Sequence, residues 1–363
     1  MKTTDQILSS GDFCADNLRQ LLSLEGVPLE ELFAVARRVR TSYSGNKVFL
    51  RGLVELSNQC AKNCYYCGVR CGNNAVKRYR MTDEEVLTAA RFAHEHRFAS
   101  MVIQAGERED RSFTSGITRL LDKIHQETGS SLHITLSLGE QSRETYREWY
   151  EHGAHRYLLR IEASDPDLYR QLHPDDDKHR YQRRLDCLYL LKEEGYQTGT
   201  GVMVGLPFQT VDHLISDLLF FRDLDIDMVG MGPYIEHEAT PLFEHHHALP
   251  APGERFFMTM KMLALLRIMM KDINIAATTA MQTIWPGGRE FALKVGANVV
   301  MPNLTPARYR DNYLLYKDKP GVNEEAEDTT ANLQAMIHQA GMEIGYGEWG
   351  DSRHYASRKK EST

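Results

Sequence analysis

The sequence predicts an α/β fold, a (β/α)8 barrel in which eight parallel strands alternate with helices. Short apolar segments of strand character recur along most of the 363 residues, and segments with helical spacing lie between them. Glycine and polar residues also follow the ends of most of these strands, where a barrel carries its active site. The expected strands are 48–56, 100–105, 133–138, 156–161, 199–204, 228–231, 275–279 and 297–301.

The segments on both sides of this repeat define three regions. Residues 1–46 have leucines at helical spacing and predict a helical cap, 47–305 form the barrel, and the more polar 306–363 form a C-terminal extension. Within the barrel, Thr82 and Glu85 form a capping box before an apolar helical segment. Leu214, Ile215 and Leu218 indicate another amphipathic helix.

The bulk composition is that of a soluble globular protein. The chain is 42% hydrophobic and 26% charged, and its net charge of -7 gives little support to nucleic-acid binding. The most apolar helical segment, 256–270, is interrupted by Lys261 and Arg267, so we expect no membrane span. The first residues lack the apolar core of a signal peptide. Four of the six cysteines lie within residues 60–71, which indicates metal chemistry in a reducing compartment, and we expect a cytoplasmic protein.

A loop with three closely spaced cysteines follows the first strand. Cys60, Cys64 and Cys67 have the spacing C-x3-C-x2-C, and the aromatic Tyr66 precedes the last of them. Three thiolates can hold three irons of a 4Fe–4S cube and leave the fourth iron open. Cys71 is a possible fourth ligand, which leaves a zinc site or a fully ligated ferredoxin-type cluster as alternatives. The lack of a second cysteine pair and of a proline after Cys71 argues against both.

This loop resembles the signature of the radical S-adenosylmethionine (SAM) superfamily. The resemblance implies that the amino and carboxylate groups of SAM chelate the open iron. It also implies that reductive cleavage of SAM yields a 5'-deoxyadenosyl radical.

Polar residues at the other strand ends are consistent with such a site. Glu107 follows the second strand and could accept hydrogen bonds from an ammonium group. Arg160 and Glu162 are two residues apart on the fourth strand and therefore share a face. They could equally form a buried ion pair of little functional meaning, and 201–205 could be glycine-rich only to relieve crowding. Their coincidence with the cysteine loop at one end of the barrel favours the functional interpretation.

From about residue 29 to 315 the chain is similar to the HydE family of FeFe-hydrogenase maturases. Besides the cysteine loop, seven stretches carry the similarity: 78–82 (RYRMT), 135–140 (TLSLGE), 156–160 (RYLLR), 203–207 (MVGLP), 227–230 (DMVG), 277–281 (ATTAM) and 286–290 (PGGRE).

The resemblance implies an enzyme of hydrogenase maturation. Its substrate would be a cysteine-bound iron carbonyl/cyanide precursor from the maturase HydG, and the radical would attack the cysteine sulfur. Its product would pass towards HydF, and an electron donor would reduce the cluster. The implied cluster ligands are Cys60, Cys64 and Cys67, and the implied SAM contacts are Tyr66, Glu107, Ser137, Glu162, Arg184 and Gly205. The implied substrate cavity consists of Arg51, Thr135, Arg160, Met228, Thr278, Thr279 and Tyr309.

The chain departs from the HydE family pattern at two places, and two alternative functions remain open. Some family members have a second iron–sulfur cluster, but residues 317–330 contain no cysteine, so we expect only one. Ala105 stands where a serine hydroxyl is expected.

One alternative function is that of a radical SAM mutase or synthase of the methylornithine synthase or biotin synthase type, acting on a small amino-acid-like substrate. A non-catalytic iron–sulfur scaffold is the other, and it would leave Glu107 and Glu162 unexplained.

Overall fold

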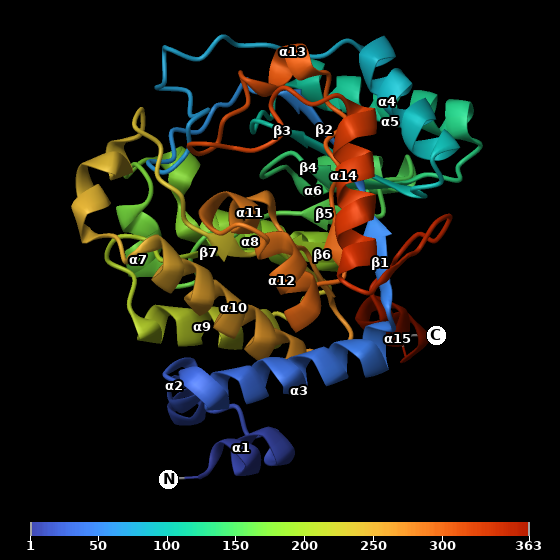
Figure 1. Cartoon of the computed structure of the whole chain (residues 1–363). Helices are drawn as coiled ribbons and strands as arrows, with labels where there is room; N and C mark the ends of the chain where they lie inside the picture. Colours follow the sequence, from blue (N-terminus) through green and yellow to red (C-terminus); the bar gives the residue numbers. More distant parts are fainter. Residues whose placement is uncertain (1, 362–363) are drawn as a thin grey trace.

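A curled sheet of seven parallel strands lies at the centre of the computed structural model, which describes residues 2–361 (Figure 1). Its spatial order is β10-β8-β6-β5-β4-β3-β2. Because all neighbours pair in parallel, the carboxyl ends of the strands meet at one edge. The strands are β2 (Gly52–Ser57), β3 (Ser100–Ala105), β4 (His133–Ser137), β5 (Arg156–Leu158), β6 (Gln197–Thr200), β8 (Met228–Val229) and β10 (Asn274–Ile275).

A smaller parallel sheet lies beside the seven strands. Here β1 (Lys47–Leu50) pairs with β11 (Val299–Val300) on one side and with β12 (Glu343–Ile344) on the other. The predicted strand 48–56 is therefore two strands, which separate at Arg51. The predicted strand 275–279 is also shorter, because Thr279 already begins helix α11 (Thr279–Ile284). A two-stranded pair, β7 (Met203–Val204) and β9 (Gly232–Pro233), continues the main sheet beyond β6 and β8.

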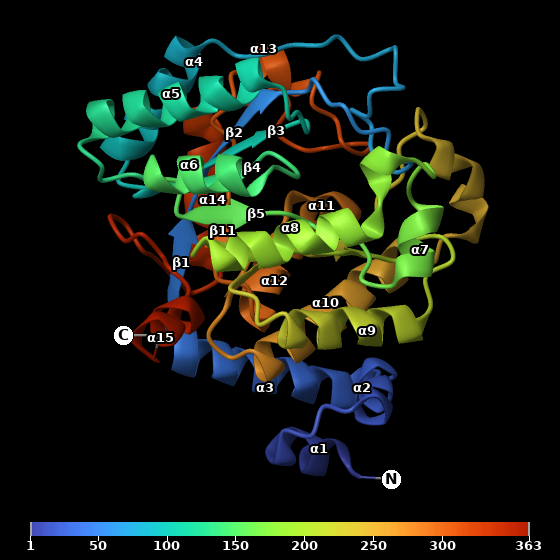
Figure 2. The ribbon, with the colours of Figure 1, turned by 180° about the vertical axis from the view of Figure 1, so that it is seen from behind.

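Helices cover the outside of the sheet (Figures 1 and 2). The capping box predicted at Thr82 is confirmed, since its hydroxyl accepts from Glu85 N while the Glu85 carboxylate accepts from Thr82 N. The other helices that surround this sheet are α4 (Asp83–Glu95), α5 (Arg111–Thr128), α6 (Arg143–Glu151), α7 (Pro166–Gln171), α8 (Tyr181–Glu193), α9 (Val211–Asp223), α10 (Pro252–Met269) and α12 (Gly288–Val295), with 3-10 helices at Asp177–His179 and Pro241–Ala248.

The N-terminal segment of the structure is helical. Its helices are α1 (Thr4–Ser10), α2 (Ala15–Leu22) and α3 (Gly26–Ser44), which lie along one end of the molecule in both ribbon views. Phe33 of α3 packs edge-on against Phe291 of α12, with ring centroids 5.6 Å apart. The buried Arg40 guanidinium donates to Ala297 O at 3.0 Å and Lys47 O at 3.2 Å, which ties α3 to the start of both β1 and β11.

The C-terminal segment returns to the amino ends of the strands. It contains α13 (Ala307–Arg310), α14 (Ala326–Gln339) and α15 (Arg353–Glu361). Between α14 and α15, Gly350 O accepts from Arg51 Nη2 at 3.2 Å and Asn274 Nδ2 at 2.8 Å, and Asp351 pairs with the buried Arg156. Among residues 2–361 we find no helix with both the length and the apolar character needed to cross a bilayer.

Candidate active site

The cysteine loop begins where β2 ends, at the carboxyl edge of the sheet. Backbone N–H groups of Lys62 and Glu107 each donate to Cys60 Sγ at 3.4 Å. Arg78, from the predicted RYRMT stretch, holds the loop by donating to four backbone carbonyls. These belong to Asn58, Val69, Arg70 and Asn73. The protein's own backbone and Arg78 therefore hold the cysteine loop in this conformation.

Three thiols and most of the predicted contacts line one cavity of about 330 Å³ at this edge. The predicted residues that the cavity brings together are Cys60, Cys64, Cys67, Tyr66, Glu107, Ser137, Glu162, Arg184, Arg160, Thr278 and Thr279. They come from loops and strand ends spread over more than 200 positions of sequence. Convergence of this kind at the carboxyl ends of parallel strands is typical of an active site.

A buried group of charges forms one wall of the cavity. Glu107 Oε1 lies 3.0 Å from Lys62 Nζ, and Glu107 Oε2 lies 3.2 Å from Arg184 Nη2. The fully buried Glu140 completes the group, 2.9 Å from Lys62 Nζ and 2.8 Å from Arg184 Nε. Burial raises the pKa of Glu107, and Glu140 adds to this while Arg184 and Lys62 oppose it. Apart from its ion pair with Lys62, Glu107 Oε1 has no partner within the described chain, so the carboxylate keeps acceptor capacity for a guest.

Glu162 and Gly139 adopt backbone conformations that position the acidic groups. Glu162 has φ +66°, which is uncommon for a non-glycine residue and frequent at functional sites. Its carboxylate lies 2.9 Å from Arg160 Nη2. Gly139 has φ +81°, and a Cβ there would lie 2.1 Å from Glu107 Cγ. Only glycine allows the chain after β4 to pass so close to Glu107.

Burial governs the chemistry of the thiols and of the adjacent aromatic ring. It raises the pKa of Cys60, raises that of Cys64 well above the usual range, and raises that of Cys67 to about 12. Such thiols become thiolates readily only when a cation or metal compensates the charge. Tyr66, beside them, contacts His173 Nε2 through its hydroxyl at 3.3 Å.

Five predicted residues lie outside the cavity wall. Arg51 and Met228 touch each other near the amino ends of the strands, with Arg51 Nη1 3.0 Å from Met228 Sδ. Thr135 lies two residues before the end of β4 and is buried in the interior, where its hydroxyl has no partner among described residues. Tyr309 stacks on Tyr79 and donates to Glu85 at 2.9 Å. Gly205 is the fifth, and its N–H donates to Gln209 Oε1 at 2.6 Å while the nearby Met203 reaches the cavity.

Several cavity residues escaped the sequence analysis. Lys62 lies inside the cysteine loop, and Gln104 precedes the last residue of β3. Their positions in the sequence could therefore have identified both as site residues. Tyr313 and Lys319 come from the C-terminal segment, where no pattern points to the site. Lys319 nevertheless pairs with the buried Glu55 of β2, and Gln104 Nε2 donates to the Tyr313 hydroxyl at 3.2 Å.

These residues fit a cluster and its nucleotide-containing ligand. Three sulfur ligands on one loop suit iron–sulfur chemistry, and N–H groups that donate to a cluster sulfur tune its potential. The adjoining carboxylates of Glu107 and Glu162 suit an ammonium group, and Arg184 suits a carboxylate. The donor set and its neighbours therefore match what a 4Fe–4S cluster and SAM require.

Comparison with known proteins agrees with this assignment. The sequence profile of the radical SAM superfamily matches residues 54–221. The [FeFe] hydrogenase maturase subunit HydE of Thermotoga maritima is 45% identical over 344 residues, covering 94% of this chain and 95% of that one. The solved structure of methylornithine synthase (PylB) is 25% identical, with a TM-score of 0.77 over 95% of this chain and 97% of that one. HydG, a maturase of the [FeFe]-hydrogenase, shares the fold at 19% identity, with a TM-score of 0.79 over 99% of this chain and 81% of that one.

Fold, site and superfamily profile together define a radical SAM enzyme. Such enzymes bind a 4Fe–4S cluster and SAM as a class, which confirms the cofactor prediction at that level. At 45% identity over nearly the whole of both chains, this chain belongs to the HydE family.

Proposed function

We propose that this radical SAM enzyme acts in the maturation of FeFe-hydrogenase, in the assembly of its diiron active site, on a cysteine-bound iron carbonyl/cyanide precursor. The cavity carries the proposal, because it brings the cysteine loop, the acidic and basic SAM contacts and Arg160 with two threonines to one place. The 45% identity to a hydrogenase maturase subunit supports the biological context.

Each group of residues has a defined task in this proposal. Cys60, Cys64 and Cys67 would hold three irons of a single 4Fe–4S cluster. When bound, the reduced cluster supplies the electron that cleaves SAM to a 5'-deoxyadenosyl radical. SAM itself is oriented by Glu107, Glu162, Arg184, Ser137 and Tyr66, and Met203 takes the contact expected in the region of Gly205.

The substrate would lie next to SAM in the same cavity, since Arg160 pairs with the SAM contact Glu162. Arg160, Thr278 and Thr279 offer a guanidinium group and two hydroxyls, which suit a guest with carboxylate or cyanide groups. The floor beneath the substrate, towards the amino ends of the strands, would consist of Arg51, Thr135 and Met228. Tyr309 lies outside the cavity and would contribute only by stacking on Tyr79. Enclosure by these groups keeps water from a reactive carbon radical.

A closed barrel supports this enclosure. We propose that β11 completes an eight-stranded barrel, because Asn298 N donates to Ile275 O and Ala277 N to Val299 O on one side, and Leu53 N donates to Pro302 O on the other. The proposed regions 1–46, 47–305 and 306–363 then act together, since Tyr313 and Lys319 of the last region complete the cavity wall.

The proposed partners follow from the same assignment. HydG would supply the precursor, HydF would receive the product, and a reduced electron carrier would serve the cluster in the cytoplasm. Nucleic acid has no place in this scheme.

Deoxyadenosine formation tests the chemistry. Anaerobic reconstitution with iron and sulfide, reduction and addition of SAM should yield 5'-deoxyadenosine. Cys64→Ala should abolish it, whereas Cys14→Ala, a change at an exposed thiol on the start of α2, should not. The proposal would be contradicted if the EPR spectrum of the cluster did not change on addition of SAM and no deoxyadenosine formed.

Complementation tests the biological role. Purified chain added to a maturation mixture that contains HydG and HydF but lacks HydE should restore hydrogenase activity. If hydrogenase activity is not restored while deoxyadenosine still forms, the result favours the second candidate function. That candidate is a mutase or synthase of small amino-acid-like substrates, which the fold shared with methylornithine synthase favours.

A further inference from the structure

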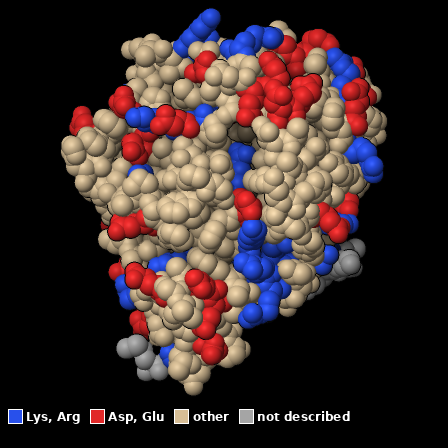
Figure 3. All heavy atoms as spheres, viewed as in Figure 1, with Lys and Arg blue, Asp and Glu red and all other residues tan. Residues whose placement is uncertain are grey.

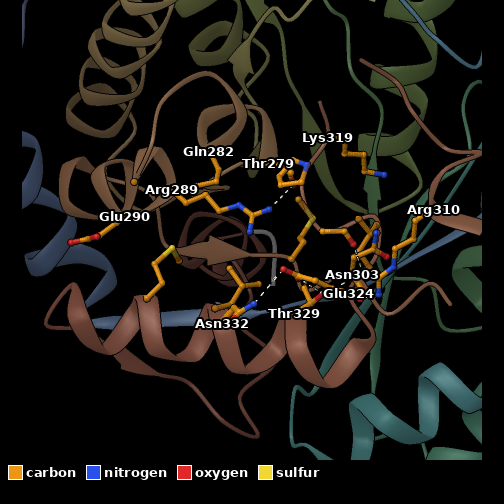
Figure 4. Close-up of a pocket in the computed structure, with 17 residues that line it drawn as sticks. Thr279, Gln282, Arg289, Glu290, Asn303, Arg310, Lys319, Glu324, Thr329 and Asn332 are labelled. Atoms are coloured by element: carbon orange, nitrogen blue, oxygen red, sulfur yellow. Dashed lines mark hydrogen bonds between the residues drawn. The ribbon is translucent and has the colours of Figure 1, made fainter. Parts of the chain in front are cut away.

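A second pocket lies directly beside the candidate active site. It lies between α11, α12 and α14, and residues of these helices and of the 303–324 segment line it; among them, Arg289 and Asn332 point into the pocket (Figure 4). Figure 3 shows the same face hollowed near its middle, with basic side chains beside the hollow. Four residues belong to the walls of both cavities: Leu53, Thr279, Met301 and Lys319. The partition between the two cavities is therefore one side chain thick at these points.

The PGGRE stretch forms one wall of this side pocket. Gly287 has φ +73° at the start of α12, and a Cβ on Gly288 would lie 2.0 Å from Met281 O. Both glycines are thus required for α12 to begin against α11. This places Arg289 in the first turn of α12, from where its Nη2 donates to Thr279 Oγ1 at 2.7 Å.

Most charges in the side pocket are already neutralised. Glu290 pairs with Lys294 at 2.5 Å, and Lys319 pairs with Glu55. Arg310 is fully buried and occupied by backbone carbonyls. Its three nitrogens donate at 2.7 Å each to Thr305 O, Gly321 O and Asn303 O.

Two opposite charges remain. Within the described part of the chain, Arg289 forms no ion pair, and its buried Nε has no hydrogen-bond partner. Glu324 likewise forms no ion pair there, and its carboxylate accepts only from Thr329 Oγ1 at 3.0 Å and Asn332 Nδ2 at 3.3 Å. Burial lowers the pKa of Arg289, while Tyr316 and Glu324 partly offset this, so the two charges act on each other without direct contact. In Figure 4 both groups point into the space between α12 and α14.

We propose that the side pocket binds the zwitterionic head group of an α-amino acid, with its carboxylate on Arg289 and its ammonium group on Glu324. A cation and an anion that form no ion pair, both half-buried in one pocket and separated by space, are complementary to a ligand that has both charges. An anion alone would meet Glu324, and a cation alone would meet Arg289. Neither would be bound as well.

The position of the side pocket beside the active site indicates a role for a bound amino acid. An amino acid held by Arg289 and Glu324 directs its side chain to the apolar partition formed by Leu53 and Met301, next to Thr279. The side pocket would then be the place where an amino-acid-bearing substrate first docks or where an amino-acid-derived product leaves. This role rests on the proposed function, whereas the binding of the zwitterion does not.

Calorimetric titration of the reconstituted full chain with L-serine tests the proposal. L-Serine is a redox-inert probe with the complete zwitterion, and 3-hydroxypropionate and ethanolamine each lack one of its charges. We expect measurable binding of L-serine and binding of both fragments that is about tenfold to a hundredfold weaker, as expected for the loss of a charged hydrogen bond.

Two variants and two matched controls locate the site. Arg289→Gln and Glu324→Gln should each weaken L-serine binding by about tenfold or more. Arg38→Gln on the exposed face of α3 and Glu327→Gln on α14 should leave it unchanged. Arg289→Gln should also remove the preference for L-serine over ethanolamine, and Glu324→Gln the preference over 3-hydroxypropionate. A simple loss of folding would not produce such opposite changes in selectivity.

Failure of this proposal is separable from failure of the proposed function. If L-serine does not bind, or binds equally to all four variants, the side pocket contains only water and the proposal is wrong. Deoxyadenosine formation by the unmodified chain would remain unaffected by that outcome. Conversely, zwitterion binding without SAM cleavage would retain the pocket and reject the radical chemistry.

Discussion

The two ends of the central sheet both bury charged residues, but they use them differently. At the carboxyl end, Lys62 and Arg184 pair with Glu107 and Glu140 beside an open cavity, and Lys62, Glu107 and Arg184 line that cavity. At the amino end, Arg156 is fully engaged: Asp351, Ser100 and Trp349 O accept its hydrogen bonds. Trp349 itself stacks on His133, with ring centroids 3.7 Å apart.

The difference shows why buried charge alone does not mark an active site. A buried ion pair contributes little net stability, and it is found in structural as well as functional places. What distinguishes the carboxyl end is an open cavity lined by three thiols, together with the left-handed backbone of Glu162 in the same wall. Four changes would test this contrast, beginning with the largest expected effect.

Glu140→Gln should damage the carboxyl end most. The change leaves Lys62, Arg183 and Arg184 with too little negative charge in a buried place, so the free energy of unfolding should fall by about 3 kcal/mol. Affinity for SAM should fall as well, because Arg184 loses the partner that orients it. Anaerobic thermal denaturation and SAM titration measure the two effects. Glu109→Gln, which removes an exposed partner of Arg183, is the control and should change neither.

Asp351→Asn should destabilise the amino end without altering the chemistry. Arg156 would lose its counter-ion, and we expect a loss of about 2 kcal/mol, moderated by the partial exposure of Asp351. Deoxyadenosine formed per folded chain should not change. Asp311→Asn, at an exposed position, serves as the control. A variant that folds normally but no longer cleaves SAM would break the contrast between the two ends.

The C-terminal helix should be held more weakly as the pH rises. Hydrogen bonds from His354 to Asp272 and Asp225, reinforced by their charges, raise its pKa from 6.5 to about 9 although burial opposes this. Lys192 and Arg358 also face Asp225, and Arg267 acts on Asp272. A raised folded-state pKa stabilises the protein below pH 6.5, and this stabilisation is lost as the pH rises towards 9.

Denaturation at pH 6.5 and pH 9 measures that loss, which we expect to be about 1 to 2 kcal/mol. His354→Gln should flatten the difference. An unchanged pH dependence in this variant would show that other groups cause it.

Cys71→Ala should have the smallest effect. Cys71 is exposed on the surface of the cysteine loop, and its N–H, not its thiol, holds the loop by donating to Lys62 O at 2.9 Å. Iron should remain at about four per chain, as for one cluster with three cysteine ligands. Loss of the cluster absorbance would show four-cysteine ligation, and a reproducible iron content of about six would show a second cluster.

Much of the fold and site follows from local sequence patterns. All eight predicted strands have a counterpart, because β-branched and apolar runs between turn residues report strand burial directly. Their ends were less certain: the 48–56 segment breaks at Arg51, and Thr279 starts a helix. The cysteine spacing and the residues after β3, β4 and β5 identified the cavity, since parallel strands bring their carboxyl ends together.

The sequence by itself determined the kind of chemistry, because three thiolates at this spacing suit few metal sites, and the alternation of strands and helices fixes the edge where they lie. Only the tertiary structure decided which distant residues join them. Lys319 reaches Glu55 across 264 positions, Asp351 reaches Arg156 across 195, and Arg289 of α12 faces Glu324, which lies just before α14. Local hydrophobic periodicity does not predict such long-range contacts, because they depend on how the C-terminal segment wraps around the sheet. The neighbours of each residue in the chain contain no information on them.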